Sequence, residues 1–140
     1  EGRDPEVMAA LGLPDAPGWM AQGCNDAVVI ELAYEAAVRA VAPDFAALAK
    51  IRRMACVTAR GDEQSIASPV FVPYCGIDED PVTGSAHAAL VPYWAPRLGR
   101  TEFTALQASR RCGLLECRLD GERVILGGRC YTVNVGQFQP

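Results

Sequence analysis

A short acidic loop followed by small residues is the part of this sequence best suited to chemistry. It covers residues 76–90 and reads Gly-Ile-Asp-Glu-Asp-Pro-Val-Thr-Gly-Ser-Ala-His-Ala-Ala-Leu. Pro81 pushes the preceding Asp80 toward an extended backbone. Residue types that precede or begin a helix follow at Thr83, Gly84 and Ser85. We therefore predict a loop, a turn at these residues, and a central helix from about Ser85 to Leu98.

The start of such a helix can hold an anion. Its first backbone N–H groups have no partner within the helix, and the helix dipole adds partial positive charge there. Gly84 has no side chain, so a carboxylate or phosphate could come close to the backbone. Asp80 would face the same place, which points to proton transfer on a bound organic acid. From the residues alone, Asp80 is explained equally well as a group that caps free N–H groups.

The single histidine, His87, is tempting as a general base. It lies two residues past Ser85, which turns it roughly 200° around the helix and away from any site that Ser85 faces. We therefore predict a structural role for His87. The acids at Asp78 and Glu79 are predicted to be solvated or to fix the loop.

Residues 79–86, Glu-Asp-Pro-Val-Thr-Gly-Ser-Ala, resemble the signature of the PhzF-like isomerases, the phenazine-biosynthesis family. The resemblance covers most of the chain from about Asn25 onward. Further similar residues are Pro92–Ala95, Leu98-Gly99, Gln107–Arg111 and Gly127. It implies a fold like that of diaminopimelate epimerase, in which two similar domains enclose a cleft.

The resemblance also implies a function, namely cofactor-independent isomerisation or epimerisation by proton transfer on a small carboxylated substrate. Asp80 would then be catalytic, Thr83, Gly84 and Ser85 would bind the substrate, and neither a metal nor a cofactor would be needed. The family's main general base is a glutamate of the first domain, and no residue here matches it. We therefore predict that the chain is the C-terminal domain, with the missing N-terminal domain or a second copy of the chain as partner.

One stretch departs from the family pattern. The family has a Gln-x-Ser-x-Arg-Gly run, but Cys112 stands here where a glycine is usual, which could alter the local turn. We predict structural roles for Gln107, Ser109 and Arg111.

Two other functions stay open. The chain could be a catalytically silent half that acts as a binding or self-associating module, because a single domain exposes the face that its partner normally covers. It could also be a cysteine-dependent racemase, although no cysteine stands at the start of the central helix, where Asp80 lies instead.

Composition restricts the remaining classes. The chain has 140 residues, half of them hydrophobic, and a net charge of −4, which fits one ordinary domain and no nucleic-acid or membrane surface. Six cysteines without a Cys-x-x-Cys pair, and one histidine, argue against structural zinc. We interpret most of these cysteines as small buried hydrophobes and predict a reducing, cytoplasmic location.

The pattern of elements predicts an α+β fold in which antiparallel strands curl around one central helix. Residues 1–24 are predicted to be a linker with a short helix after Asp4, and residues 25–140 the domain. A pair of short helices is predicted on either side of Pro43. The predicted strands are residues 28–32, 54–59, 70–73, 102–108, 114–119, 124–126 and 130–135, with hairpin turns at 120–121 and 127–128.

Overall fold

A computed structural model of the chain describes residues 3–21 and 26–137. The helices are α1 (Pro5–Ala10), α2 (Glu35–Arg39), α3 (Phe45–Ile51), η1 (a 3-10 turn, Pro73–Cys75) and α4 (Gly84–Leu98). The strands are β1 (Gly18–Ala21), β2 (Ala27–Glu31), β3 (Ala55–Arg60), β4 (Ile66–Ala67), β5 (Val70–Val72), β6 (Ile77–Glu79), β7 (Glu102–Gln107), β8 (Gly113–Asp120) and β9 (Arg123–Gly127). None of these helices is long and apolar enough to cross a membrane.

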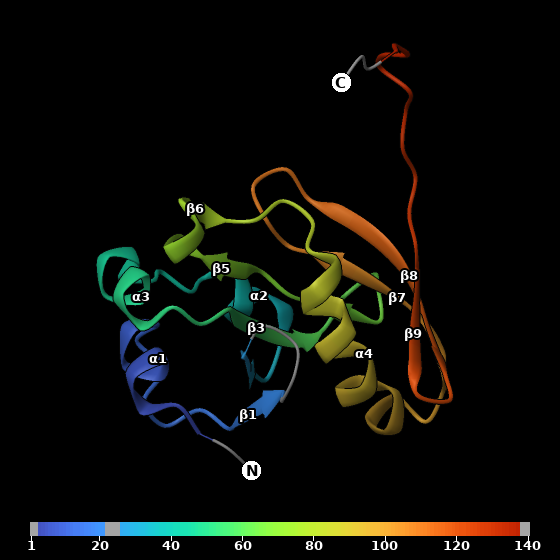
Figure 1. Cartoon of the computed structure of the whole chain (residues 1–140). Helices are drawn as coiled ribbons and strands as arrows, with labels where there is room; N and C mark the ends of the chain where they lie inside the picture. Colours follow the sequence, from blue (N-terminus) through green and yellow to red (C-terminus); the bar gives the residue numbers. More distant parts are fainter. Residues whose placement is uncertain (1–2, 22–25, 138–140) are drawn as a thin grey trace.

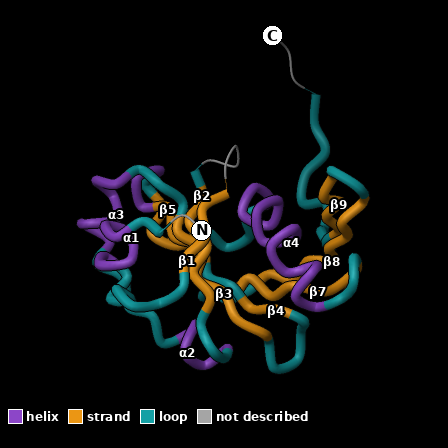
Figure 2. The backbone as a smooth tube through the Cα atoms, turned by 90° about the horizontal axis from the view of Figure 1, so that it is seen from below, coloured by secondary structure: helices purple, strands orange, loops and turns teal. Residues whose placement is uncertain are grey.

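One curled sheet organises the molecule. Its strands follow the order β1-β2-β3-β4-β7-β8-β9, while β5 and β6 branch from β3. The sheet bends around α4, which Figure 2 shows lying between β2 and β9. The predicted α+β fold, with strands curled around one central helix, is therefore confirmed. The strands are not all antiparallel, however, because β2–β3 and β4–β7 run parallel.

The middle of the sheet is apolar on both faces. Val29 and Cys56 point into a core shared with α4, whereas Val28, Ile30 and Val57 point into a second core built with α1 and α3. All five residues are buried. Such burial explains why β2 and β3 are mostly apolar on both faces, since helices cover both sides of them (Figure 1).

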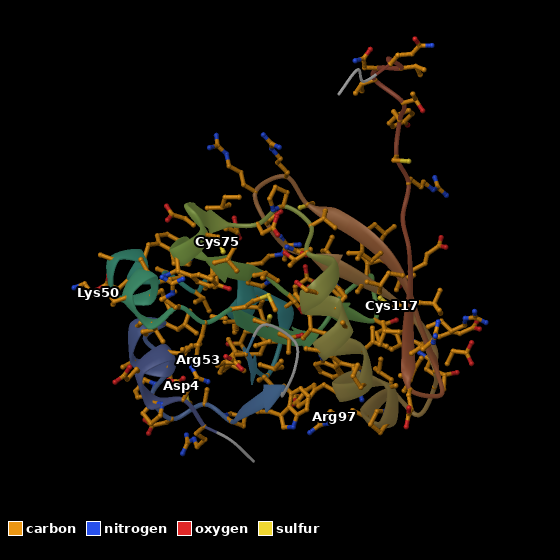
Figure 3. The ribbon with its side chains drawn as sticks, in the orientation of Figure 1. Asp4, Lys50, Arg53, Cys75, Arg97 and Cys117 are labelled. Atoms are coloured by element: carbon orange, nitrogen blue, oxygen red, sulfur yellow. The ribbon has the colours of Figure 1, made fainter. Side chains whose placement is uncertain are left out.

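The first part of the chain packs onto this second core. Asp4 caps α1 by accepting the backbone N–H groups of Glu6 and Val7, as the Asp4-Pro5 pair predicts. Asp4 also pairs with Arg53 at 3.1 Å, between the Asp4 Oδ2 and Arg53 Nε atoms (Figure 3). β1 then pairs antiparallel with β2. The predicted boundary between residues 24 and 25, with Cys24, lies outside the described residues.

Three polar contacts fix α4 against the sheet. The Trp94 indole N–H donates to the Thr58 hydroxyl at 3.0 Å, within the core. The Tyr93 hydroxyl donates to Glu31 at 2.7 Å. The Arg97 side chain, labelled in Figure 3, places its Nε atom 3.6 Å from Glu31 Oε2 of β2. These contacts fix the position of α4 relative to β2 and β3, and they therefore also fix where the start of the helix lies in the molecule.

The last predicted strand, residues 130–135, is wrong. β8 and β9 form the predicted hairpin, with Gly121 at a positive φ of 58°. Beyond β9 the chain runs on unpaired to residue 137 and points away from the body (Figure 1). Neither Gly127 nor Gly128 has the positive φ that a two-residue hairpin turn needs, so the chain does not reverse there.

Candidate functional site

The predicted turn delivers the chain to the start of α4. The Asp80 backbone N–H donates to the Val70 carbonyl at 3.0 Å, which holds the loop to β5. Thr83 is the residue before the first helical turn, with an extended backbone, and α4 begins at Gly84. The predicted position of the helix start is therefore confirmed.

Asp80 and Thr83 are joined through their side chains. The Thr83 hydroxyl donates to Asp80 Oδ2 at 2.6 Å. Because this hydroxyl is engaged with the carboxylate, Thr83 makes no side-chain cap on α4. The first N–H groups of α4 therefore receive no hydrogen-bond acceptor from the Thr83 side chain, although the residue at this position usually supplies one. Asp80 is half-buried, and its carboxylate is positioned beside this helix start.

A fully buried glutamine holds both residues. Gln107 lies at the end of β7, where its Oε1 accepts the Thr83 backbone N–H at 2.7 Å. Its Nε2 donates to the Asp80 carbonyl at 2.6 Å and to the Thr83 hydroxyl at 3.0 Å. Since the Thr83 oxygen accepts from Gln107, its own proton is left for Asp80. The structural role predicted for Gln107 thus extends to the orientation of the Asp80 carboxylate.

The segment after β7 holds the other side of the loop. The Ser109 hydroxyl donates to the Pro81 carbonyl at 3.1 Å, and the Arg110 backbone N–H donates to Glu79 at 3.2 Å. Glu79 therefore fixes the loop, as predicted. A Cβ atom on Gly113 would clash with Val82, so glycine is required where β8 passes beneath the loop.

Cys112 has a backbone conformation that glycine adopts more readily than other residues. Its φ is +54°, in the left-handed region that residues with a side chain seldom adopt. The Cys112 N–H donates to the Ser109 carbonyl at 3.0 Å, which closes this turn. The residue at which the sequence departs from the expected run therefore lies in a closed turn.

The two residues that begin α4 face outward. Gly84 and Ser85 are exposed. A Cβ atom built on Gly84 would meet only Leu126 Cδ1, at 4.0 Å. No contact in the described part of the chain therefore requires glycine at position 84. A ligand that binds close to the backbone there would require it, because a side chain would keep the ligand away.

His87 points the other way, as its spacing from Ser85 predicts. It is fully buried, and its Nδ1 lies 2.9 Å from the Thr83 carbonyl. A carbonyl only accepts, so Nδ1 carries the proton, and Nε2 has no partner among the described residues. Burial lowers the pKa of His87 below its ordinary value. A neutral histidine that supports the first turn of α4 fits the predicted structural role.

Two of the thiols in residues 3–21 and 26–137 are deeply buried and are therefore poor nucleophiles. Cys56 and Cys117 are buried, and this burial raises their pKa values to about 12 and about 11. Figure 3 shows Cys117 on β8, beneath α4, and Cys75 at η1. Among residues 3–21 and 26–137, no three His, Cys, Asp or Glu side chains are grouped so that they could hold a metal ion.

The site is open rather than enclosed. The largest described hollow, of about 620 Å³, lies over β7, β8 and β9 and includes no residue of the 80–85 segment. A hollow of about 410 Å³ reaches Pro81, between Ile77 and the Arg110-Arg111 pair. Gly84 and Ser85 are exposed and thus lie on an uncovered surface of the described residues.

Comparisons with known sequences show which proteins this chain is similar to. The sequence profile of the PhzC-PhzF family, described as phenazine biosynthesis-like protein, matches residues 3–136. An uncharacterized isomerase of Pseudomonas aeruginosa is 48% identical over 139 residues, which is 99% of this chain and 52% of that protein. A phenazine biosynthesis-like domain-containing protein of Homo sapiens is 51% identical over 68 residues, 47% of this chain and 24% of that one.

Solved structures show the same fold. A PhzF family protein of Enterococcus faecalis has a TM-score of 0.78 at 40% identity, covering 91% of this chain and 48% of its own. A protein described as putative PhzC/PhzF, from Clostridium difficile, has a TM-score of 0.76 at 26% identity, covering 94% and 53%. The fold is therefore the diaminopimelate epimerase-like fold of these proteins.

The chain spans about half the length of the P. aeruginosa relative and of each of these two structures. The matched profile nevertheless covers nearly all of the chain, including the whole segment from Asp80 to Ser85. The chain belongs to the phenazine biosynthesis-like (PhzC-PhzF) protein family.

Proposed function

We propose that this chain forms one wall of an isomerase or epimerase site that moves a proton on a small carboxylated substrate without a cofactor. One observation carries the proposal: the Thr83 hydroxyl donates a hydrogen bond to Asp80 and does not cap α4. A carboxylate and an uncapped helix start are thereby placed side by side. The names of relatives support the reaction class, since two proteins of P. aeruginosa, 48% and 42% identical, are called isomerases.

The helix start holds the substrate. The substrate carboxylate accepts hydrogen bonds from the N–H groups at Gly84 and Ser85 and from the Ser85 hydroxyl, and the helix dipole supports its binding. The backbone of Thr83 shapes the approach to this position, while its own N–H is already bonded to Gln107. The absence of a side chain at Gly84 lets the carboxylate come close.

Asp80 handles the proton. Its Oδ2 is held by Thr83, and its Oδ1 receives no hydrogen bond from the described residues, so Oδ1 is the atom that meets the substrate. A C–H proton of the substrate passes to one carboxylate of the site. The other carboxyl group returns a proton to a different carbon of the substrate or to the opposite face of the same carbon. Two electrons stay on the substrate throughout, so the step balances without an oxidant or reductant.

The other acid or base comes from outside this wall. The family resemblance implies a glutamate of the first domain as the general base, and Gly84 and Ser85 are uncovered in this chain. An N-terminal domain, or a second copy of the chain, supplies the opposite wall and excludes water, which strengthens proton transfer between two carboxyl groups.

Binding and chemistry are tested separately. Acetate and benzoate, added to the ¹⁵N-labelled chain, are expected to shift the Gly84, Ser85 and Ala86 amide signals. Proton transfer is followed by ¹H NMR in D₂O, as loss of C–H signal from a panel of small amino and hydroxy acids, with the chain assembled with the N-terminal domain or with a second copy so that both walls are present. Asp80→Asn should abolish exchange and keep the acetate-induced shifts. Exchange that survives in Asp80→Asn would overturn the assignment of Asp80.

A thiol mechanism is distinguished by alkylation. Iodoacetamide reacts with exposed thiols such as Cys75 and Cys112 and should leave exchange unchanged. Exchange that stops on alkylation, and is retained in Asp80→Asn, would assign the reaction to a cysteine instead.

A second candidate function is that of a binding module without catalysis. The exposed helix start favours it, because an uncovered wall can hold an acid without an opposing base. Amide shifts with acetate, together with no exchange in an assembled protein, would select this function.

A further inference from the structure

A hollow lies over the second core, on the side of the sheet away from α4. Its volume is about 440 Å³, and it lies between the connection from α2 to α3 and the segment that follows β7. Figure 2 shows α1 and α3 on the other side of β2 and β3 from α4. None of residues 80–85 lines this hollow. It is therefore separate from the helix start described above, and we call it the β5 groove.

The floor of the β5 groove is apolar and partly aromatic. Phe71 of β5 and Phe45 of α3 both line it, with ring centres 6.0 Å apart and ring planes at 61°. Val38 and Pro69 line it as well. Phe71 is buried, whereas Phe45 is only half-buried. An apolar group that covers this floor removes apolar surface from water and can pack against the Phe45 ring.

The rims of the β5 groove carry charged groups. Arg110 lines one rim, and its side chain has no hydrogen bond or ion pair with the residues that the structure describes. Arg39 lines the other, and its Nη2 lies 2.7 Å from Glu35 Oε1. Glu79 also lines the groove, and it accepts the Arg110 backbone N–H at 3.2 Å. The Arg110 guanidinium is therefore the charged group that a ligand meets without displacing a partner in the described chain.

The β5 groove continues into the hollow of about 410 Å³ that reaches Pro81. Both hollows are lined by Glu79, Ser109 and Arg110, and Arg111 joins the lining in the second one. Together they are lined by three arginines and one glutamate, in a chain whose net charge is −4. A positive hollow on an acidic chain favours an anionic ligand over a cationic one.

We propose that the β5 groove binds a small organic anion with an apolar body, whose carboxylate pairs with Arg110 while the body packs on Phe45 and Phe71. A guanidinium holds a carboxylate through two parallel hydrogen bonds, which fixes the direction of the ligand. The volume of the groove lies within the roughly 300–1,000 Å³ that small-molecule sites occupy. The inference does not depend on the reaction proposed above, because the groove and the helix start share no residue.

Two acids with different bodies test this binding. 2-Naphthoate has an aryl body and octanoate an alkyl body, and each is added to the ¹⁵N-labelled chain. At least one is expected to shift the amide signals of residues 38–45 and 108–111, and the tighter one identifies the kind of body. Acetate lacks the body and 2-naphthalenemethanol lacks the charge, so each should bind about tenfold more weakly at these signals. Shifts at Gly84, Ser85 and Ala86 report the helix start separately.

Variants at exposed positions locate the ligand. Arg110→Gln removes the charge and should weaken binding of the tighter acid about tenfold. Arg123→Gln is the matched control, because Arg123 lies on β9 and lines neither hollow. Ala42 is exposed and lines the groove, so Ala42→Trp fills it without disturbing the core and should abolish binding.

Three results would overturn the proposal. The first is that neither acid shifts the signals of residues 38–45 and 108–111. The second is that 2-naphthalenemethanol binds as tightly as 2-naphthoate, which would remove the role of the charge. The third is that binding in Arg110→Gln and Ala42→Trp equals that in the wild type and in Arg123→Gln, which would place the ligand elsewhere.

Discussion

The Gln107 side chain accepts the Thr83 backbone N–H at 2.7 Å and donates to the Thr83 hydroxyl at 3.0 Å. One buried amide thus determines both the path of the chain into α4 and the direction in which the Thr83 proton points. That proton goes to Asp80. The Asp80 carboxylate, which is predicted to be catalytic, is therefore oriented by Gln107, a residue 27 positions away in the sequence.

Loss of the Gln107 amide should therefore loosen the site and the fold together. Gln107→Leu leaves the Thr83 N–H and the Asp80 carbonyl without partners, which we expect to lower the free energy of unfolding by about 1–3 kcal/mol. Gln107→Glu is the matched control for shape, since it keeps an acceptor for Thr83 and loses the donor to Asp80. Urea unfolding measures the first effect, and the acetate-induced amide shifts measure the second. Unchanged stability in Gln107→Leu would contradict this role.

Two glycines near the site should respond in opposite ways to alanine. Gly84→Ala has space for its Cβ, so the free energy of unfolding should stay within about 1 kcal/mol of the wild type. The added methyl group should weaken acetate binding about tenfold, or about 1.4 kcal/mol. Gly113→Ala would force its Cβ against Val82 and cost about 1–3 kcal/mol of stability. Equal acetate affinity in Gly84→Ala would argue against close approach of a ligand.

Thr58 should be important for the anchoring of α4. Its hydroxyl accepts from Ser68 at 2.6 Å and from Trp94 at 3.0 Å, all within the core. Thr58→Val keeps the shape and leaves both donors unpaired, so we expect a loss of about 2–6 kcal/mol, from roughly 1–3 kcal/mol per buried unpaired group. Thermal unfolding followed by tryptophan fluorescence measures it. Thr58→Ser, which retains the hydroxyl, should recover most of the stability.

The buried His87 should make stability depend on pH. Burial lowers the pKa of His87 in the folded chain, so below about pH 6.5 the unfolded chain binds the proton more readily. Stability is therefore retained above about pH 6.5 and falls as the pH drops from there toward the lowered folded-state pKa. The slope is at most about 1.4 kcal/mol per pH unit.

Urea unfolding between pH 7.5 and 5 measures this slope, and His87→Gln should flatten it. Glu35 also has a lowered pKa, caused first by the Asp62 backbone N–H and also by Arg39. Its stabilising effect is lost only as the pH falls below about 4.3 toward its own folded-state value, which separates the two groups. A slope near pH 6 that persists in His87→Gln would assign it to another residue.

Much of the fold follows from local patterns. The Asp4-Pro5 cap, the turn into α4 and the Gly121 hairpin are set by residue types that prefer those backbone angles, so the sequence predicts them correctly. Buried runs such as residues 54–59 are recognisable as strands because five of their six residues are apolar. The strand predicted over residues 130–135 fails, because alternating apolar residues show that a segment could be a strand but not whether a neighbouring strand is there to pair with it.

The sequence by itself determined the family, the start of the central helix and the residue types that could bind and deprotonate an acid. Only the tertiary structure decided how they are joined. The Thr83 hydroxyl donates to Asp80 because it accepts a hydrogen bond from the Gln107 side chain of β7. His87 is neutral because the core surrounds it. Such contacts depend on distances between residues far apart in the chain, and these distances exist only after the sheet has closed around α4.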